Sequence, residues 1–178
     1  MDSVIGNKSG KVLLTMFSQN TNLLLAFLRD HNTARSVLDV FNDLYAMFGR
    51  ETYCRLFPVI LTDRGSEFSN PVPIEQDEND ELRSLVFYCN PSAPYQKGGI
   101  EVAHELVRRV LPKGKSFDDL QQEDIDLMLS HINSYKRGKL NSRSAYQLFN
   151  FIYGDDILPK LNIREIEAND IVLSPNCL

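Results

Sequence analysis

Val59-Ile60-Leu61-Thr62-Asp63-Arg64-Gly65-Ser66-Glu67-Phe68 is an apolar run that ends abruptly in a carboxylate and a glycine. The apolar residues predict a buried strand, and Gly65 is typical of the tight turn that would end it. Asp63 would then lie at the carboxyl end of a strand, where open α/β sheets bind their ligands. Alternatively, Asp63 only caps a short helix that follows. This stretch alone leaves both interpretations open.

Composition indicates an ordinary globular domain of 178 residues, 43% hydrophobic and 24% charged. The net charge of −5 argues against a dedicated nucleic-acid binder, but bases cluster in 108–115 and 136–143, which indicates a locally basic face. Nothing resembles a membrane span or a signal peptide. Cys54, Cys89 and Cys177 have neither metal-binding spacing nor a disulfide pattern, so we expect a cytoplasmic protein.

The order of predicted elements indicates an α/β fold. Residues 1–5, 11–17 and 23–28 predict three strands joined by polar turns, an antiparallel meander. A helix follows over 33–48, from the cap Thr33 to a stop at Gly49. The strand ending at Asp63 and the run 85–89 come after this helix, so we expect them to join in parallel. Further helices are predicted over the ranges 100–111, 120–135, 144–153 and 155–161. We therefore predict a five-stranded mixed sheet, three antiparallel strands then two parallel, flanked by helices.

Three carboxylates could converge in such a sheet. Asp2 and Asp63 would lie on adjacent central strands, and Glu101 would approach from the first turn of a neighbouring helix. A first-turn acid also interacts favourably with the helix dipole and need have no other role. Three carboxylates that meet would not all stay ionised without a cation. Two Mg²⁺ or Mn²⁺ ions suit such oxygen ligands and could catalyse phosphoryl transfer.

These residues resemble a known family. Asp2, the run 61–68 and the segment Asn90-Pro91-Ser92-Ala93-Pro94-Tyr95-Gln96-Lys97-Gly98-Gly99-Ile100-Glu101 resemble the DDE catalytic core of retroviral-type integrases and insertion-sequence transposases. Residues 111–114 and 133–149 resemble the IS-thirty group of bacterial transposases, although Ala145 stands where that pattern usually has proline. The resemblance covers roughly the whole chain as one module, with a core over 1–153 and an extension over 154–178.

The resemblance implies an RNase H-like fold and metal-dependent nicking and strand transfer of DNA during transposition in a bacterial cytoplasm. Asp2, Asp63 and Glu101 would bind the two metal ions. The partners would be the terminal repeats of the element, its target DNA and a second copy of the chain. Gln96 and Lys97 match a loop that touches DNA. Because of their charge and position, we also expect Arg64, Arg108 and Lys113 to contact DNA phosphates. The alternative is that each of them is only a solvated charge on the surface.

Several alternatives remain open. A transposase usually carries a helix-turn-helix domain before its core, and no such domain precedes Asp2, so we expect a core fragment with weak specific DNA binding. The chain could instead be a non-catalytic dimerisation module, or an RNase H-like nuclease without strand transfer. For Glu67 we expect a supporting or capping role. For His104 we expect a packed or surface position without metal binding.

Overall fold

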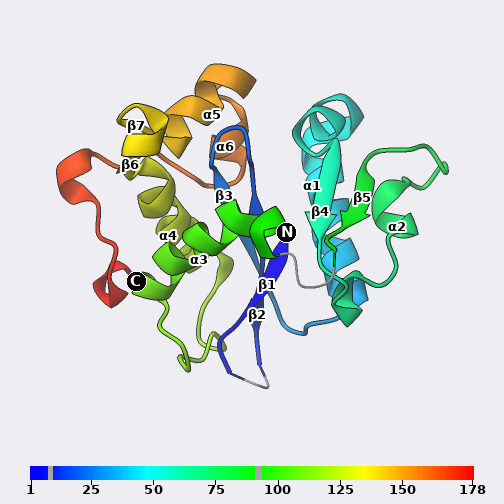
Figure 1. The fold of residues 1–178 in the computed structure, drawn as a ribbon, viewed down its shortest axis with the longest axis horizontal. Coiled ribbons are helices and arrows are strands. Elements are labelled where there is room, and N and C mark those ends of the chain that lie inside the picture. The colour runs from blue at the N-terminus through cyan, green and yellow to red at the C-terminus, as the bar shows by residue number, and fades with distance from the viewer. Residues whose placement is uncertain (8–9, 91–93) are drawn as a thin grey trace.

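The computed structural model describes residues 1–7, 10–90 and 94–178. An antiparallel sheet lies at the centre of the molecule, with strand order β1-β2-β3 (Figure 1). Its strands are β1 (Asp2–Ile5), β2 (Val12–Phe17) and β3 (Leu24–Arg29). In register, Asp2 lies opposite Thr15 and Phe17 lies opposite Leu24. The predicted meander is confirmed, except that residues 8–9 of its first turn lie outside the described residues.

The predicted parallel pair is also confirmed, but the single five-stranded sheet is wrong. β4 (Val59–Thr62) and β5 (Leu85–Tyr88) pair in parallel and form a sheet of their own. At the junction, the Met1 nitrogen donates to the Leu61 carbonyl oxygen, which places the start of β1 beside β4. A parallel ladder consists of a series of evenly spaced hydrogen bonds, whereas Met1 and Leu61 form a single hydrogen bond. The two sheets are therefore neighbours that are not joined by a ladder.

The helices follow the predicted order and surround the sheets. They are α1 (Ala34–Leu56), α2 (Val72–Glu75), α3 (Gly98–Val110), α4 (Gln122–Ser134), α5 (Ala145–Tyr153) and α6 (Ile157–Lys160). Figure 1 shows β4, β5, α1 and α2 on one side of β1, and α3 to α6 on the other. Thr33 caps α1 as predicted. Gly49, at φ 71°, interrupts α1, but the helix resumes and continues to Leu56, beyond the predicted stop.

Two small features were not predicted. The basic segment holds a short antiparallel pair, β6 (Lys136–Arg137) and β7 (Arg143–Ser144). Short 3₁₀ turns lie at Ser66–Phe68, Pro94–Lys97, Gly138–Leu140, Ala168–Asp170 and Pro175–Cys177. All three cysteines are free thiols, in keeping with the expected lack of disulfides. Within the described ranges, none of the helices combines the length and apolar character needed to cross a bilayer.

Helix α4 covers the outer edge of β3 and satisfies its backbone. The buried Asn133 accepts from the Leu24 N–H at 2.9 Å and donates to the Leu24 carbonyl at 2.8 Å. Gln122 accepts from the Leu28 N–H at 2.8 Å and donates to the Ala26 carbonyl at 3.1 Å. Two amide side chains thus bond the edge as a neighbouring strand would, which protects it from pairing with another chain.

Candidate active site

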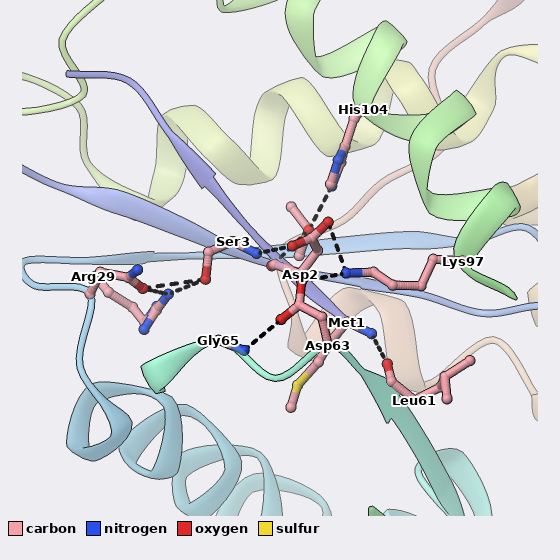
Figure 2. Close-up of polar contacts among 11 residues, drawn as sticks. Met1, Asp2, Ser3, Arg29, Leu61, Asp63, Gly65, Lys97 and His104 are labelled. Atoms are coloured by element: carbon pink, nitrogen blue, oxygen red, sulfur yellow. Dashed lines mark hydrogen bonds and ion pairs between the residues drawn. The ribbon is translucent and has the colours of Figure 1, made fainter. Parts of the chain in front are cut away.

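Two of the three predicted carboxylates meet at one positive charge. Asp2 is the first residue of β1, and Asp63 directly follows β4, so the junction of the two sheets brings them together. The Lys97 ammonium lies 3.2 Å from Asp2 Oδ2 and 3.0 Å from Asp63 Oδ2 (Figure 2). Both carboxylates therefore direct one oxygen at the same point in space.

Local backbone geometry fixes the other oxygen of each carboxylate. Asp63 Oδ1 accepts from the Gly65 N–H at 2.9 Å, which closes a turn immediately after β4. A Cβ at residue 65 would lie 2.5 Å from Glu67 Oε2, so a larger residue there would displace the end of the Glu67 side chain. Asp2 Oδ1 accepts from the Ser3 N–H at 2.9 Å. These bonds hold each side chain with its Oδ2 free to face Lys97.

Electrostatics favour the charged forms of Asp63 and Lys97. Burial alone would raise the pKa of Asp63, but the hydrogen bonds from Lys97 and Gly65 outweigh burial and hold this pKa below its ordinary value. Burial would likewise lower the pKa of Lys97, but the bond to Asp63 and the charge of Asp2 outweigh it and raise this pKa. The Lys97 side chain is only 12% exposed, so its ammonium is well shielded from water.

Glu101 does not join this pair. It lies in the first turn of α3, on the exposed face of the helix. The buried stripe of α3 includes Ile100, Ala103, Val107 and Val110, and it sets that orientation. Over residues 1–7, 10–90 and 94–178, no three Asp, Glu, His or Cys side chains come close enough to hold a metal ion. A ligand role for Glu101 stays a prediction, and it requires the exposed side chain to turn toward Asp2 and Asp63.

The donor set partly fits a divalent cation. Asp2 and Asp63 offer hard oxygen ligands to one shared position, as Mg²⁺ and Mn²⁺ prefer. The Lys97 ammonium stands in for such a cation, because it is the positive group that both carboxylates bind. Two carboxylates are thus arranged for a metal, whereas a second ion would need further ligands.

The residues predicted to contact DNA fall into two groups. In the first group, Lys97 bridges the carboxylates and the exposed Arg64 directly follows Asp63. Gln96 belongs to the same group and accepts a hydrogen bond from the Asn90 N–H at 2.8 Å. Residues 91–93, which lie between Asn90 and Gln96 in the sequence, are outside the described residues. Arg108 instead donates to the Ile5 carbonyl at 2.9 Å. Lys113 is exposed beyond the far end of α3, roughly 20 Å along the helix from Lys97. Of these residues, Lys97 is the one that contacts the carboxylates in the described part of the chain.

Sequence reasoning missed a support for Asp2. Thr15 Oγ1 donates to the Asp2 carbonyl at 3.0 Å and lies 2.8 Å from His104 Nε2. Because the hydroxyl has one hydrogen, His104 must be the donor in the second bond. Burial lowers the pKa of His104, despite the opposing charge of Asp2, and so favours the neutral ring. His104 is thus packed, as expected, but it also helps to hold β1; no sequence signal links it to Thr15.

A second missed support centres on Arg29, which is buried. Its guanidinium donates to Ser3 Oγ at 3.1 Å and to Asn32 Oδ1 at 2.9 Å. Asn32 in turn donates to Glu67 Oε1 at 3.1 Å. Burial lowers the pKa of Arg29 to about 10, although the charge of Glu67 opposes the shift. The network ties β1 to the turn after Asp63, in keeping with the supporting role expected for Glu67.

Comparisons with known proteins agree with the resemblance. ORF3 of Spiroplasma virus SpV1-R8A2 B, whose name describes an integrase, is 29% identical over 84% of this chain. The transposase for insertion sequence element IS4351 of Bacteroides fragilis is 23% identical over 84% of the chain, and transposase InsI for element IS30A of Escherichia coli K12 is 22% identical over 83%. The chain spans 44%, 43% and 36% of these relatives, less than half of each. No family model matches.

Solved structures show a similar fold. The catalytic core domain of BIV integrase superposes with a TM-score of 0.54 and 20% identity, over 86% of this chain and 90% of that chain. A chain of the simian T-cell lymphotropic virus intasome in complex with PP2A regulatory subunit B56 gamma gives a TM-score of 0.58 and 16% identity, over 93% and 55%. At these identities the likeness concerns the fold alone. The protein has an α/β fold similar to the retroviral integrase catalytic core, which is RNase H-like.

Proposed function

Because the chain resembles the catalytic cores of retroviral-type integrases and IS30-type transposases, we propose that it catalyses metal-dependent nicking and strand transfer of DNA in transposition. The observation that carries the proposal is the meeting of Asp2 and Asp63 at one cation position. Two carboxylates from different sheets converge there, each with its outer oxygen fixed by a backbone N–H.

In this proposal Asp2 and Asp63 hold Mg²⁺ or Mn²⁺, and Glu101 turns inward to complete the ligand set. The bound metal would polarise a phosphate and help to activate the attacking oxygen. Gly65 and Ser3 keep the two carboxylates aimed at the shared position, so Asp2 and Asp63 themselves need little rearrangement when the ion binds. Lys97 leaves that position, and its ammonium is then available to contact a DNA phosphate, as is the exposed guanidinium of Arg64.

The decisive experiment uses DNA that represents an element end, already nicked so that its 3′-hydroxyl is free. This DNA is incubated with target DNA and Mn²⁺, and joined products are separated on a denaturing gel. We expect the wild-type chain to join the two DNAs and Asp63→Asn to lose joining. The control Asp39→Asn changes an acid that pairs with Arg35 on the exposed surface of α1, and it should join as well as wild type.

The same assay tests two other functions. Glu101 lies apart from the pair and Lys97 occupies the cation position, which favours a non-catalytic dimerisation module as the second candidate. That candidate predicts no metal-dependent product, together with a dimer in sedimentation velocity. Cleavage without joining, lost in Asp63→Asn, would indicate an RNase H-like nuclease instead.

A further inference from the structure

The pair β6 and β7 lies in a part of the chain that has no acidic residues. Between Asp126 and Asp155 there is neither Asp nor Glu, although the whole chain has 24 acids and a net charge of −5. The two strands and the turn that joins them, residues 136–144, form a hairpin beyond the end of α4 (Figure 1). We call it the basic hairpin, because it carries Lys136, Arg137, Lys139 and Arg143.

Three of these bases face solvent with their charge uncompensated. Lys136, Lys139 and Arg143 are exposed, and none of them forms an ion pair within the described ranges of the chain. Arg35 and Arg50, in contrast, are exposed bases that pair with acids. The hairpin is therefore a local concentration of positive charge on a molecule that is negative overall.

The rest of the hairpin holds these three bases in place. Arg137 is only partly exposed, and its guanidinium donates to the Asn22 and Ile132 carbonyls, both at 3.4 Å. At the other end, Ser144 caps α5: its hydroxyl accepts from the Gln147 N–H at 3.1 Å, and the Gln147 side chain accepts from the Ser144 N–H at 3.3 Å. Both strands are thus anchored to the body of the protein.

The hairpin is anchored at the same end of the central sheet as the carboxylate pair. Asp2 begins β1 opposite Thr15, near the end of β2, and Asn22 lies in the turn that follows β2. β1 and β3 flank β2, so their axes are about 10 Å apart. Adding the width of the hairpin gives a distance of roughly 20 Å from the carboxylates to the three exposed bases.

The surface between the hairpin and the carboxylates is polar and free of acids along the chain. The turn between β2 and β3 has the sequence Ser-Gln-Asn-Thr-Asn over residues 18–22. Its exposed Gln19 and Asn20 border the same cavity as Gln96 and Lys97. Amide side chains of this kind bind phosphate oxygens as Lys and Arg do. One acid, Glu165, lies at the border of the hairpin, where it accepts from Gln147 Nε2 at 2.8 Å.

We propose that the basic hairpin is a second contact surface for duplex DNA, at which Lys136, Lys139 and Arg143 bind backbone phosphates. The choice of DNA as the partner rests on the function proposed above. One turn of B-DNA is about 34 Å long, so a duplex held at the carboxylates reaches the hairpin within its first turn. Contacts of this kind position the duplex and are independent of its sequence.

The test measures binding without chemistry. A labelled duplex of about 20 base pairs is titrated in EDTA at about 50 to 200 mM salt, and binding is followed by fluorescence anisotropy. We expect Lys136→Gln, Lys139→Gln and Arg143→Gln, combined in one chain, to bind about tenfold more weakly than wild type at about 100 mM salt. The slope of log affinity against log salt should become shallower by about 2–3, because each lost phosphate contact contributes about 0.9.

The matched control combines Arg35→Gln, Arg55→Gln and Lys160→Gln, which remove the same charge from exposed positions outside the hairpin. This control should lose less than about threefold in affinity, and thermal melts should show that both triple variants fold. Equal losses in the two triple variants, or no measurable binding by wild type at about 50 mM salt, would overturn the proposal. A larger effect on single-stranded RNA than on the duplex would do so as well. A wild-type chain that shows the expected difference but joins no DNA would contradict the catalytic function and leave the hairpin contact standing.

Discussion

At the scale of single residues, Lys97 determines how readily the carboxylates accept a metal. Its ammonium pairs with Asp2 and Asp63, so a divalent ion must displace it. Two partly screened ion pairs contribute about 1–2 kcal/mol together, hence we expect Lys97→Met to bind Mn²⁺ about tenfold more tightly than wild type without DNA. Isothermal titration calorimetry measures this difference.

Arg64→Met is the matched control for Lys97. Arg64 carries the same charge beside Asp63, but it forms no ion pair with either carboxylate in the described part of the chain. Its removal should change Mn²⁺ affinity much less than removal of Lys97. Equal affinities for wild type and Lys97→Met would mean that the ammonium does not compete with the metal.

The parts of the candidate site that depend on residues neighbouring in the sequence could be predicted. Asp63 follows a short apolar run and precedes a glycine, and this pattern alone places it at the end of β4. Asp2 was expected beside it in a single five-stranded sheet, and the two residues do meet although β1 and β4 belong to separate sheets. The bridging role of Lys97 could not be predicted, because it depends on where α3 begins relative to two separate strands. The outward orientation of Glu101, in contrast, follows from the buried apolar stripe of α3.

At the scale of elements, the contact between α4 and the edge of β3 offers a sharp test. Asn133→Leu would leave both the N–H and the carbonyl of Leu24 buried without their present partner. Each lost buried bond costs about 1–2 kcal/mol, so we expect the free energy of unfolding to fall by about 2–4 kcal/mol in urea denaturation. Glu123→Leu places the same residue on the exposed face of α4 and should change stability little. Similar losses in both variants would contradict the proposed edge contact.

The elements themselves were largely predictable, whereas their pairing was less so. The strands and helices follow hydrophobic periodicity and caps such as Thr33, which act within a few residues. Whether β1 and β4 share a ladder depends on residues about sixty positions apart, which meet here through one bond. β6 and β7 have two residues each, too short to show any periodicity.

At the scale of the whole molecule, the C-terminal residues bind across α4 and extend the core. Ile163 is buried, and the amides of Arg164 and Ile166 donate to Ser130 Oγ and Ser134 Oγ at 3.1 and 2.9 Å. Further on, the Val172 N–H donates to His131 Nδ1 at 3.2 Å, and the turn Pro175–Cys177 contacts α3. No local sequence pattern indicates this docking, because the contacts are backbone bonds to polar side chains of a distant helix.

This docking should weaken in mild acid. Burial, and secondarily the charge of Arg164, lower the pKa of His131, and its neutral Nδ1 is the acceptor for Val172. A base with a lowered pKa contributes full stability above its unfolded value of about 6.5, and this contribution is lost as the pH falls through the folded value. The pKa of His104 is lowered as well, so the pH dependence of stability in the wild-type chain includes contributions from both histidines. His131→Asn keeps an acceptor near Nδ1 without a titrating group. Thermal melts from pH 8 to 5 should therefore show a smaller loss of stability in His131→Asn than in wild type, and parallel profiles would exclude His131 as the source.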